Sequence, residues 1–442
     1  MSRKSKPLPA PIEADILSLT HEGRGLTRID GKTVFVDGAL PGERVRLRYT
    51  RVQRRFDEAE VEAVLTASPD RIAPHCAHFG VCGGCALQHL HPEAQIRIKH
   101  ESLRDVLEHL GKVTPERWLA PLTAEPWGYR RKARLGVRHV VKKGRTLVGF
   151  RERRNSFLAD LHHCPVLHPQ VGERLDVLAA TIDRLSIRDQ VPQIELAMGD
   201  GPCVLVLRVM QPPTAEDIAH LLALGEREGF HLYLQEGGID SIRPLPGQAV
   251  DLHYSLPNHG VEIGFLPSDF TQVNLELNRR MIDQALTLLD PSPEATVLDL
   301  FCGLGNFTLP LARRAATVVG VEGDAGLVER ARRNAERNGL SNVQFYLADL
   351  QAELSDAALW TRQPFTHALL DPPRSGAWEV LDWLPRLGVE RLVYVSCYPT
   401  TLARDAERLV HTLGYRLRAA GVMDMFPHTS HVESMALFER VR

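Results

Sequence analysis

The sequence of 442 residues has no apolar run long enough to cross a membrane. It begins Met-Ser-Arg-Lys-Ser-Lys and continues with Pro-Leu-Pro-Ala-Pro, which does not resemble the apolar core of a secretory signal. The seven cysteines form an odd set, which argues against a disulfide-built secreted protein and for a reducing compartment. We therefore expect a cytoplasmic protein with more than one domain.

Lysine is also scarce, with 8 residues against 45 arginines and none beyond Lys143. A GC-rich genome accounts for much of this bias, but the flat head of arginine also suits phosphate and base contacts. The net charge is only −2, yet residues 1–154 carry 29 basic and 18 acidic side chains, whereas residues 155–442 carry 24 and 37. The near-neutral total conceals a basic front and an acidic rear, so it does not exclude a nucleic-acid partner.

Three cysteines lie close together in a glycine-rich stretch. Cys76, Cys82 and Cys85 form a C-x5-C-x2-C pattern, in which glycines let several thiolates turn toward one point. Cys164, which precedes a proline, is a candidate for the fourth ligand. Four thiolates suit an iron–sulfur cluster or a tetrahedral zinc ion, and the spacing is not the C-x3-C-x2-C of radical S-adenosylmethionine (SAM) enzymes. The histidines nearby are alternative ligands or surface groups: His75, His78, His89, His162 and His163.

Short alternating runs separated by turn signals predict a small antiparallel β-barrel near the N-terminus. Because side chains alternate along a strand, Arg44, Arg46 and Arg48 are expected on one face. Residues 44–55 hold six arginines and no acid, a pattern more typical of phosphate binding than of a solvated face. The predicted strands cover residues 12–17, 25–29, 33–36, 45–49 and 59–64.

A second basic block covers residues 127–154. It holds eleven basic side chains and one acid, Glu152, with Trp127, Tyr129 and Phe150 between them. Aromatic rings beside arginines suit single-stranded RNA, which needs both stacking and positive charge.

From about residue 295, apolar strands alternate with helices in a doubly wound, Rossmann-like α/β pattern. Helices are expected over residues 324–338 and 400–413, in addition to one over 92–111 near the cysteines. The predicted strands cover residues 296–300, 317–321, 343–347, 367–370, 391–396, 415–422 and 435–439. We predict three domains: a β-barrel (1–70), a central α+β domain with the cysteines (71–265) and the Rossmann-like domain (266–442).

The first of these strands leads into a glycine turn, Asp299-Leu-Phe-Cys-Gly-Leu-Gly-Asn-Phe-Thr. Two glycines let a ligand approach the backbone at a helix start, but Thr308 replaces the third glycine of a dinucleotide fingerprint, so NAD is disfavoured. Glu322 closes the second strand, where a carboxylate can accept ribose hydroxyls, and Asp349 follows the third. Acids at three neighbouring strand ends are consistent with SAM, which carries no phosphate.

The fourth strand ends at Asp371-Pro-Pro-Arg-Ser-Gly and the fifth at Ser396-Cys397-Tyr-Pro. These ends should lie side by side at the edge of a parallel sheet, which favours Cys397 as a nucleophile over a core-filling thiol. Cys203 and Cys302 are expected to be structural. Glu433 precedes the last strand and is either a general base or a strand-edge acid.

Together these motifs resemble the bacterial RNA uracil-C5 methyltransferases, most closely the branch that modifies 23S ribosomal RNA, over nearly the whole chain. Residues 23–32 and 40–43 are similar to a TRAM domain. The resemblance implies that Cys76, Cys82, Cys85 and Cys164 hold a [4Fe-4S] cluster, which favours iron–sulfur over zinc. The transfer-RNA branch lacks both barrel and cluster, so the resemblance points to 23S rRNA as the partner.

The resemblance also implies roles for single residues. Cys397 would be the nucleophile, Glu433 the general base and Phe270 a contact to RNA. The implied contacts to the SAM cofactor or to the substrate base are Gln272, Phe301, Asn306, Glu322, Asp349 and Asp371. We expect a monomer that acts on a flipped uridine in a single-stranded loop through a covalent adduct, with a purely structural cluster.

Four other functions are alternatives to this interpretation. A cytosine-C5 RNA methyltransferase would carry a cysteine just after the proline of the fourth strand end, and an N6-adenine enzyme would carry an aromatic residue where Arg374 stands. A non-catalytic iron–sulfur RNA-binding or assembly factor would need neither Cys397 nor Glu433. A uracil-C5 methyltransferase acting on transfer RNA also stays an alternative.

Overall fold

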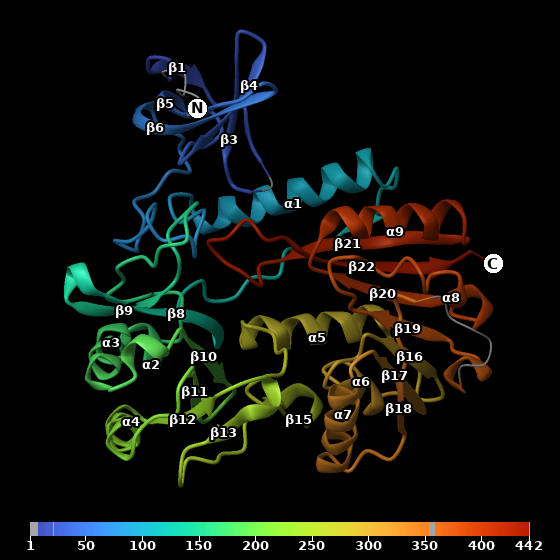
Figure 1. Ribbon diagram of the computed structural model, residues 1–442. Coiled ribbons are helices and arrows are strands. Elements are labelled where there is room, and N and C mark those ends of the chain that lie inside the picture. Colours follow the sequence, from blue (N-terminus) through green and yellow to red (C-terminus); the bar gives the residue numbers. More distant parts are fainter. Residues whose placement is uncertain (1–7, 21, 353–358, 442) are drawn as a thin grey trace. The chain divides into compact units, whose positions relative to one another are not determined.

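The computed structural model describes residues 8–20, 22–352 and 359–441. The first seven residues, on which the argument against a secretory signal partly rests, lie outside these ranges. The chain divides into two compact units. Figure 1 shows the ribbon coloured by residue number, from blue at the N-terminus to red at the C-terminus. The first unit comprises Met1–Lys99, Arg151–Phe157 and Phe426–His431, and the second comprises His100–Phe150, Leu158–Met425 and Val432–Arg442. The division into three domains therefore stays a prediction. Within the described ranges, no helix combines the length and apolar character needed to cross a bilayer.

A six-stranded sheet forms most of the first unit. Its order is β1-β5-β6-β4-β3-β2, and β4 pairs with β6 in parallel, so the expectation of a wholly antiparallel sheet is wrong at this pair. The cause is that the chain passes through β5 between β4 and β6, which lets two strands of the same direction become neighbours. Apolar side chains such as Val34, Val45 and Leu47 form the core. The strands are β1 (Ile12–Asp15), β2 (Ser18–Leu19), β3 (Gly25–Ile29), β4 (Lys32–Asp37), β5 (Arg44–Val52) and β6 (Phe56–Thr66).

The arginines of β5 do share an exposed face, as predicted. However, neighbouring strands place acids against them. Arg44 lies 3.5 Å from Glu13 on β1, and Arg48 is ion-paired with Glu60 on β6. Acids from β1 and β6 therefore neutralise part of the positive charge of this face. This weakens the prediction that the face binds phosphates.

The second unit contains a sheet of order β13-β12-β11-β10-β8-β9. Tyr129 of the second basic block is buried beside it and is not exposed to stack on a base, contrary to what the sequence suggested. The strands are β8 (Lys132–Val140), β9 (Arg145–Gly149), β10 (Gln193–Met198), β11 (Cys203–Arg208), β12 (Phe230–Gln235) and β13 (Ile242–Pro244). The helices in this part are α2 (Pro169–Gly172), α3 (Leu175–Arg184) and α4 (Ala215–Glu228), and a hairpin of β14 (His253–Leu256) and β15 (Val261–Gly264) follows.

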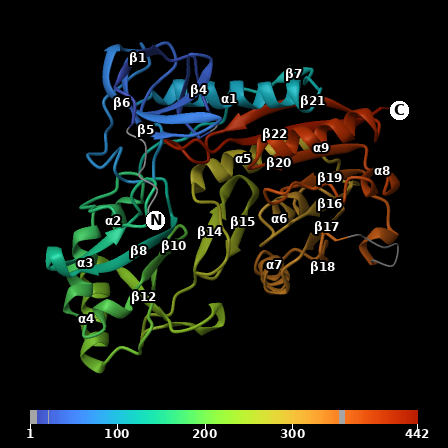
Figure 2. The ribbon, with the colours of Figure 1, turned by 45° about the horizontal axis from the view of Figure 1, so that its top comes forward.

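The C-terminal half of the second unit is built on an eight-stranded sheet (Figures 1 and 2). The strand order of this sheet is β18-β17-β16-β19-β20-β22-β21-β7. Strands β16 to β20 pair in parallel, and β22 runs antiparallel between β20 and β21. The strands are β7 (Arg117–Trp118), β16 (Thr296–Leu300), β17 (Thr317–Glu322), β18 (Val343–Leu347), β19 (His367–Leu370), β20 (Arg391–Ser396), β21 (Tyr415–Met423) and β22 (Glu433–Arg440).

Helices flank this sheet, and α9 packs against β21 while α5 contacts β19, β20 and β22. Helix α7 begins where the Asp324 side chain accepts a hydrogen bond from the Leu327 amide, a regular N-cap. The helices are α1 (Pro92–His109), α5 (Leu275–Leu289), α6 (Thr308–Ala312), α7 (Ala325–Arg337), α8 (Trp383–Arg386) and α9 (Pro399–His411). Because the strands are parallel, their carboxyl ends meet at one edge, where the residues selected from the sequence gather.

Candidate active site

Glu322 closes a loop at the carboxyl end of β17. One of its carboxylate oxygens accepts a hydrogen bond from the Gly303 amide at 3.0 Å, and the other accepts from Gly323 at 2.7 Å and Asp324 at 3.1 Å. The side chain thus ties the glycine turn after β16 to the loop after β17. Asp349, after β18, is exposed and accepts from the Gln351 amide at 2.9 Å. Both acids lie at the predicted strand ends.

The glycine turn after β16 has an unusual backbone. Phe301 has φ of 64°, a left-handed conformation that costs a non-glycine residue energy, and Gly303 and Gly305 have φ of 54° and 91°. The Asn306 amide exchanges two hydrogen bonds with Asn278 at 3.0 and 3.1 Å. Asn306 therefore connects the glycine turn to Asn278 of α5. A direct contact between Asn306 and a cofactor stays a prediction.

Asp299 is a buried acid near the end of β16 and the first of the three strand-end acids that the sequence analysis associated with SAM. Its Oδ2 accepts a hydrogen bond from the Thr308 hydroxyl at 2.5 Å, and its Oδ1 has no hydrogen-bond partner among the described residues. Burial, together with the nearby Asp371 and Glu322 carboxylates, raises its pKa to about 8, so it is protonated at neutral pH. Its position near the end of β16, the first strand of the Rossmann-like pattern, is the feature of the sequence that points to it.

Strand pairing brings Cys397 and Glu433 together. Ser396, the last residue of β20, pairs with Ser434 of β22 in antiparallel register, so the residue that follows β20 and the residue that precedes Ser434 lie at the same end of this strand pair. These are Cys397 and Glu433, which are 36 residues apart in sequence. The alternative that Glu433 is merely a strand-edge acid is weakened, because its carboxylate lies close enough to contribute to the raised pKa of the Cys397 thiol.

The pKa of Cys397 reports the charges around it. Burial raises this pKa to about 11, with further contributions from Glu433 and Asp371, while Arg374 opposes the shift. The pKa of Asp371 is itself raised to about 7 by burial. The thiol, two carboxyl groups and one guanidinium therefore share one electrostatic environment at this sheet edge.

Asp405 of α9 is a supporting residue that the sequence did not reveal. Its fully buried carboxylate accepts hydrogen bonds from the Ala377 amide at 2.8 Å and the Tyr394 hydroxyl at 2.7 Å. Arg404 donates to it at 2.8 Å and to the Ser375 carbonyl at 2.9 Å. This network joins the loop after Asp371 to β20, the strand that ends just before Cys397.

The segment before α5 presents one aromatic side chain to solvent. Phe270 is 71% exposed, whereas its neighbour Asp269 is buried and ion-paired with Arg330 at 2.6 Å. Lys132, from the second basic block, donates to the Pro267 carbonyl. Gln272 is half-buried two residues further on. The contacts of Asp269 and Pro267 thus hold the segment before α5 in place. The Phe270 side chain is exposed and can contact RNA.

The three clustered cysteines lie in the first unit, and all are half-buried thiols. The Gly84 amide donates to Cys82 Sγ at 3.3 Å, the kind of hydrogen bond that stabilises a metal-bound thiolate. Residues 151–153 pair with this stretch through Gly83 and Val81. Three thiols in one short stretch are the type of donor that an iron–sulfur cluster requires. Cys164 lies in the second unit, where its amide donates to the Gly172 carbonyl.

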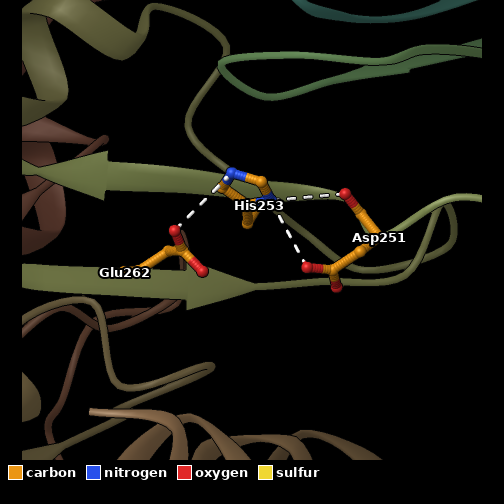
Figure 3. A group of neighbouring side chains, drawn as sticks. All are labelled: Asp251, His253 and Glu262. Carbon is orange, nitrogen blue, oxygen red and sulfur yellow. Dashed lines mark hydrogen bonds and ion pairs between the residues drawn. The ribbon is translucent and has the colours of Figure 1, made fainter.

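One further group of potential metal ligands was not predicted. Among the residues that the structure describes, Asp251, His253 and Glu262 form the one set of three whose ligand atoms gather within 4.8 Å (Figure 3). His253 lies 3.4 Å from Asp251 and 3.6 Å from Glu262. Arg337 of α7 is ion-paired with both carboxylates, so its single positive charge offsets part of their negative charge. The group fastens the β14–β15 hairpin to α7.

Comparisons with known proteins agree with this geometry. Residues 252–441 match the family profile described as tRNA (Uracil-5-)-methyltransferase, and residues 11–61 match the TRAM domain. The chain is 57% identical to the 23S rRNA (uracil(1939)-C(5))-methyltransferase RlmD of Alkalilimnicola ehrlichii, over 100% of this chain and 99% of that protein. It is 54% identical to the enzyme of the same name from Methylococcus capsulatus, over 99% of each chain.

A solved structure shows the same fold. The Pyrococcus abyssi tRNA (uracil-54, C5)-methyltransferase in complex with S-adenosyl-L-homocysteine superimposes with a TM-score of 0.73, covering 96% of this chain and 99% of that one at 24% identity. The matches to these two relatives extend over 99–100% of this chain. The chain therefore belongs to the family of RNA uracil-C5 methyltransferases, in the branch of the 23S rRNA enzymes.

Proposed function

We propose that this protein transfers the methyl group of SAM to C5 of a uridine in 23S rRNA, at the position equivalent to uracil 1939 of its relatives. The observation that supports the proposal is the pairing of β20 with β22, which ends next to Cys397 and Glu433, together with the influence of Glu433 and Asp371 on the pKa of Cys397. The identity of 57% over the whole chain supports the substrate.

The chemistry needs a nucleophile because C5 of uracil is too electron-poor to take a methyl group directly. The Cys397 thiolate adds to C6 and makes C5 nucleophilic, and C5 then takes the sulfonium methyl group, so that S-adenosyl-L-homocysteine is released. Glu433 removes the C5 proton, the C6–S bond breaks, and Cys397 leaves as a thiolate. One methyl group is gained and one proton lost at C5.

The remaining residues bind and orient. Glu322 holds the glycine turn, as its three hydrogen bonds indicate, and would receive the ribose of the cofactor together with Asp349. Gln272, Phe301 and Asn306 would line the rest of the cofactor site. Asp371, whose pKa of about 7 leaves a substantial protonated fraction at neutral pH, could donate a hydrogen bond to the base.

The front part of the chain would bind the RNA around a flipped uridine, with exposed Phe270 stacking nearby. Cys76, Cys82, Cys85 and Cys164 would hold a [4Fe-4S] cluster that supports folding and takes no part in methyl transfer. With RNA and SAM as substrates, the protein would work in the cytoplasm, as a monomer.

A trapping experiment tests this function. A 23S rRNA transcript that spans the target uridine is incubated with methyl-labelled SAM, and products are separated on a denaturing gel. The native enzyme should yield 5-methyluridine, Glu433→Gln should accumulate a methylated RNA–protein adduct, and Cys397→Ala should give neither. Turnover by Cys397→Ala would refute the covalent scheme, and labelling of transfer RNA in preference to the 23S transcript would refute the substrate.

A further inference from the structure

The chain segment just before Glu433 folds with a distant part of the sequence. Residues Phe426–His431 belong to the first unit, although the chain on both sides of them belongs to the second. We refer to this segment as the 426–431 loop. Glu433 begins β22 only two residues after the loop ends. Whatever holds the loop therefore restrains the point at which the chain enters β22.

Backbone hydrogen bonds fasten the loop to the residues that follow Cys85. The His428 carbonyl accepts from the Ala86 amide at 2.8 Å and from the Leu87 amide at 3.0 Å. His428 has φ of 66°, a conformation that a non-glycine residue adopts only when its surroundings compensate the cost. The two amides supply part of that compensation.

Gln95 of α1 makes the connection from a second side. It is 1% exposed, and its Oε1 accepts from the His428 amide at 2.9 Å. Its Nε2 donates to the Leu87 carbonyl at 3.0 Å and the Leu90 carbonyl at 2.8 Å, and lies 3.3 Å from His428 Nδ1. One buried amide thus joins α1, the stretch after the cysteines and the loop before Glu433.

A third attachment comes from Lys99, one helical turn beyond Gln95. Its buried ammonium group donates to the Phe426 carbonyl at 3.1 Å. Within the loop, the Thr429 hydroxyl donates to the same carbonyl at 2.9 Å. The first and third residues of the loop are therefore both held by side chains of α1.

We infer that Gln95 is a positioning residue for the general base Glu433, and that Lys99 assists it. The inference rests on the proposed function, because it concerns the release step that Glu433 performs. Attack by Cys397 and methyl transfer do not use Glu433 as a base, so a loosened loop should leave them nearly intact. Removal of the C5 proton does require Glu433 at the right place, and a displacement of about 1 Å slows such a step strongly.

The test follows both stages of a single turnover with the full-length enzyme, the 23S transcript and labelled SAM. For Gln95→Ala we expect adduct formation near the native rate and release of methylated RNA slowed on the order of tenfold, the effect of losing a buried hydrogen-bonded amide. Lys99→Met should slow release in the same direction by a smaller factor. Restoring some of the contacts with Gln95→Glu, which retains the acceptor for His428, should give an intermediate rate.

Two controls separate positioning from general damage. Gln248→Ala removes a glutamine whose Oε1 accepts from the Leu232 amide at 3.2 Å in the second unit, so it should lower thermal stability while methylated RNA is released at the native rate. Glu433→Gln must trap the adduct; if it does not, the covalent scheme itself fails. If Glu433→Gln traps the adduct but folded Gln95→Ala and Lys99→Met release product at the native rate, the positioning role is refuted. Should Gln95→Ala not fold, Lys99→Met alone decides.

Discussion

The protonation of Cys397 provides the most direct test of the active-site geometry. Its pKa is raised to about 11 by burial and by the carboxylates of Glu433 and Asp371. We predict that Glu433→Gln lowers this pKa, because the substitution removes a negative charge that disfavours the thiolate while leaving a side chain of almost the same size.

The magnitude follows from the titration. With a pKa of about 11, roughly one thiol in a thousand is ionised at pH 8. Burial is the largest cause of the shift and is unchanged by the substitution, so removal of one carboxylate should lower the pKa by about one unit or less. The thiolate fraction at pH 8 then rises by about threefold to tenfold.

The assay is alkylation by iodoacetamide at several pH values, with the Cys397 peptide quantified by mass spectrometry. Cys203 serves as an internal reference, because burial raises its pKa to about 12 and it should stay unreactive in the folded protein. Glu379→Gln is the matched control, since it removes an exposed carboxylate that follows the same loop as Arg374 and does not contribute to the shift at Cys397.

The reasoning would be refuted by an unchanged or higher alkylation pKa in Glu433→Gln. Either result would mean that Glu433 and Cys397 do not face one another across the β20–β22 pair. An equal shift in Glu379→Gln would show that overall charge, and not local pairing, sets the reactivity of the thiol.

Three further predictions concern stability and the cysteines. The pKa of Asp299 is about 8 in the fold against 3.8 ordinarily, so the folded state holds the extra proton between these values and stability should fall as pH rises from 4 to 8, by at most about 1.4 kcal/mol per pH unit; Asp299→Asn should flatten this slope in urea titrations. Asp37 is ion-paired with Arg24, Arg153 and Arg154, so Asp37→Ala should lower the free energy of unfolding by about 1–3 kcal/mol, and a change below about 0.5 kcal/mol in denaturant melts would contradict the contacts. Cys82→Ala, or chelation of the native protein, should lower the melting temperature and weaken binding to the 23S transcript in filter assays; a folded variant with native affinity would exclude a structural cluster.

Much of the eight-stranded sheet was predictable. Strands over residues 296–300, 343–347, 367–370 and 391–396 have the predicted bounds, because buried parallel strands are nearly continuous apolar runs between turn signals. The last strand begins two residues earlier than predicted and includes Glu433. The two-residue strands β2 and β7 escaped prediction, since so short a segment has no period to detect.

Partners distant in the sequence were not predictable in this way. The arginines of β5 were read as unopposed, but Glu13 and Glu60 reach them only after the strands have paired. Likewise, Tyr129 was expected to be available for RNA, yet its burial depends on what packs around it. Composition within a window reports the residues that are neighbours in the chain, and a sheet joins residues from separate windows.

The sequence by itself determined the chemistry: a thiol after one strand, acids after several others, a glycine turn, clustered cysteines and a basic front. These are local patterns, and they can be recognised in the sequence without knowledge of the tertiary structure. Only the tertiary structure decided which groups meet. The antiparallel pairing of β22 with β20 ends next to Glu433 and Cys397, Asp405 joins the Asp371 loop to β20, and Gln95 fastens the loop before Glu433. Strand register and buried hydrogen bonds join residues that are tens to hundreds of positions apart. The spacing of residues along the chain therefore cannot predict which of these groups meet.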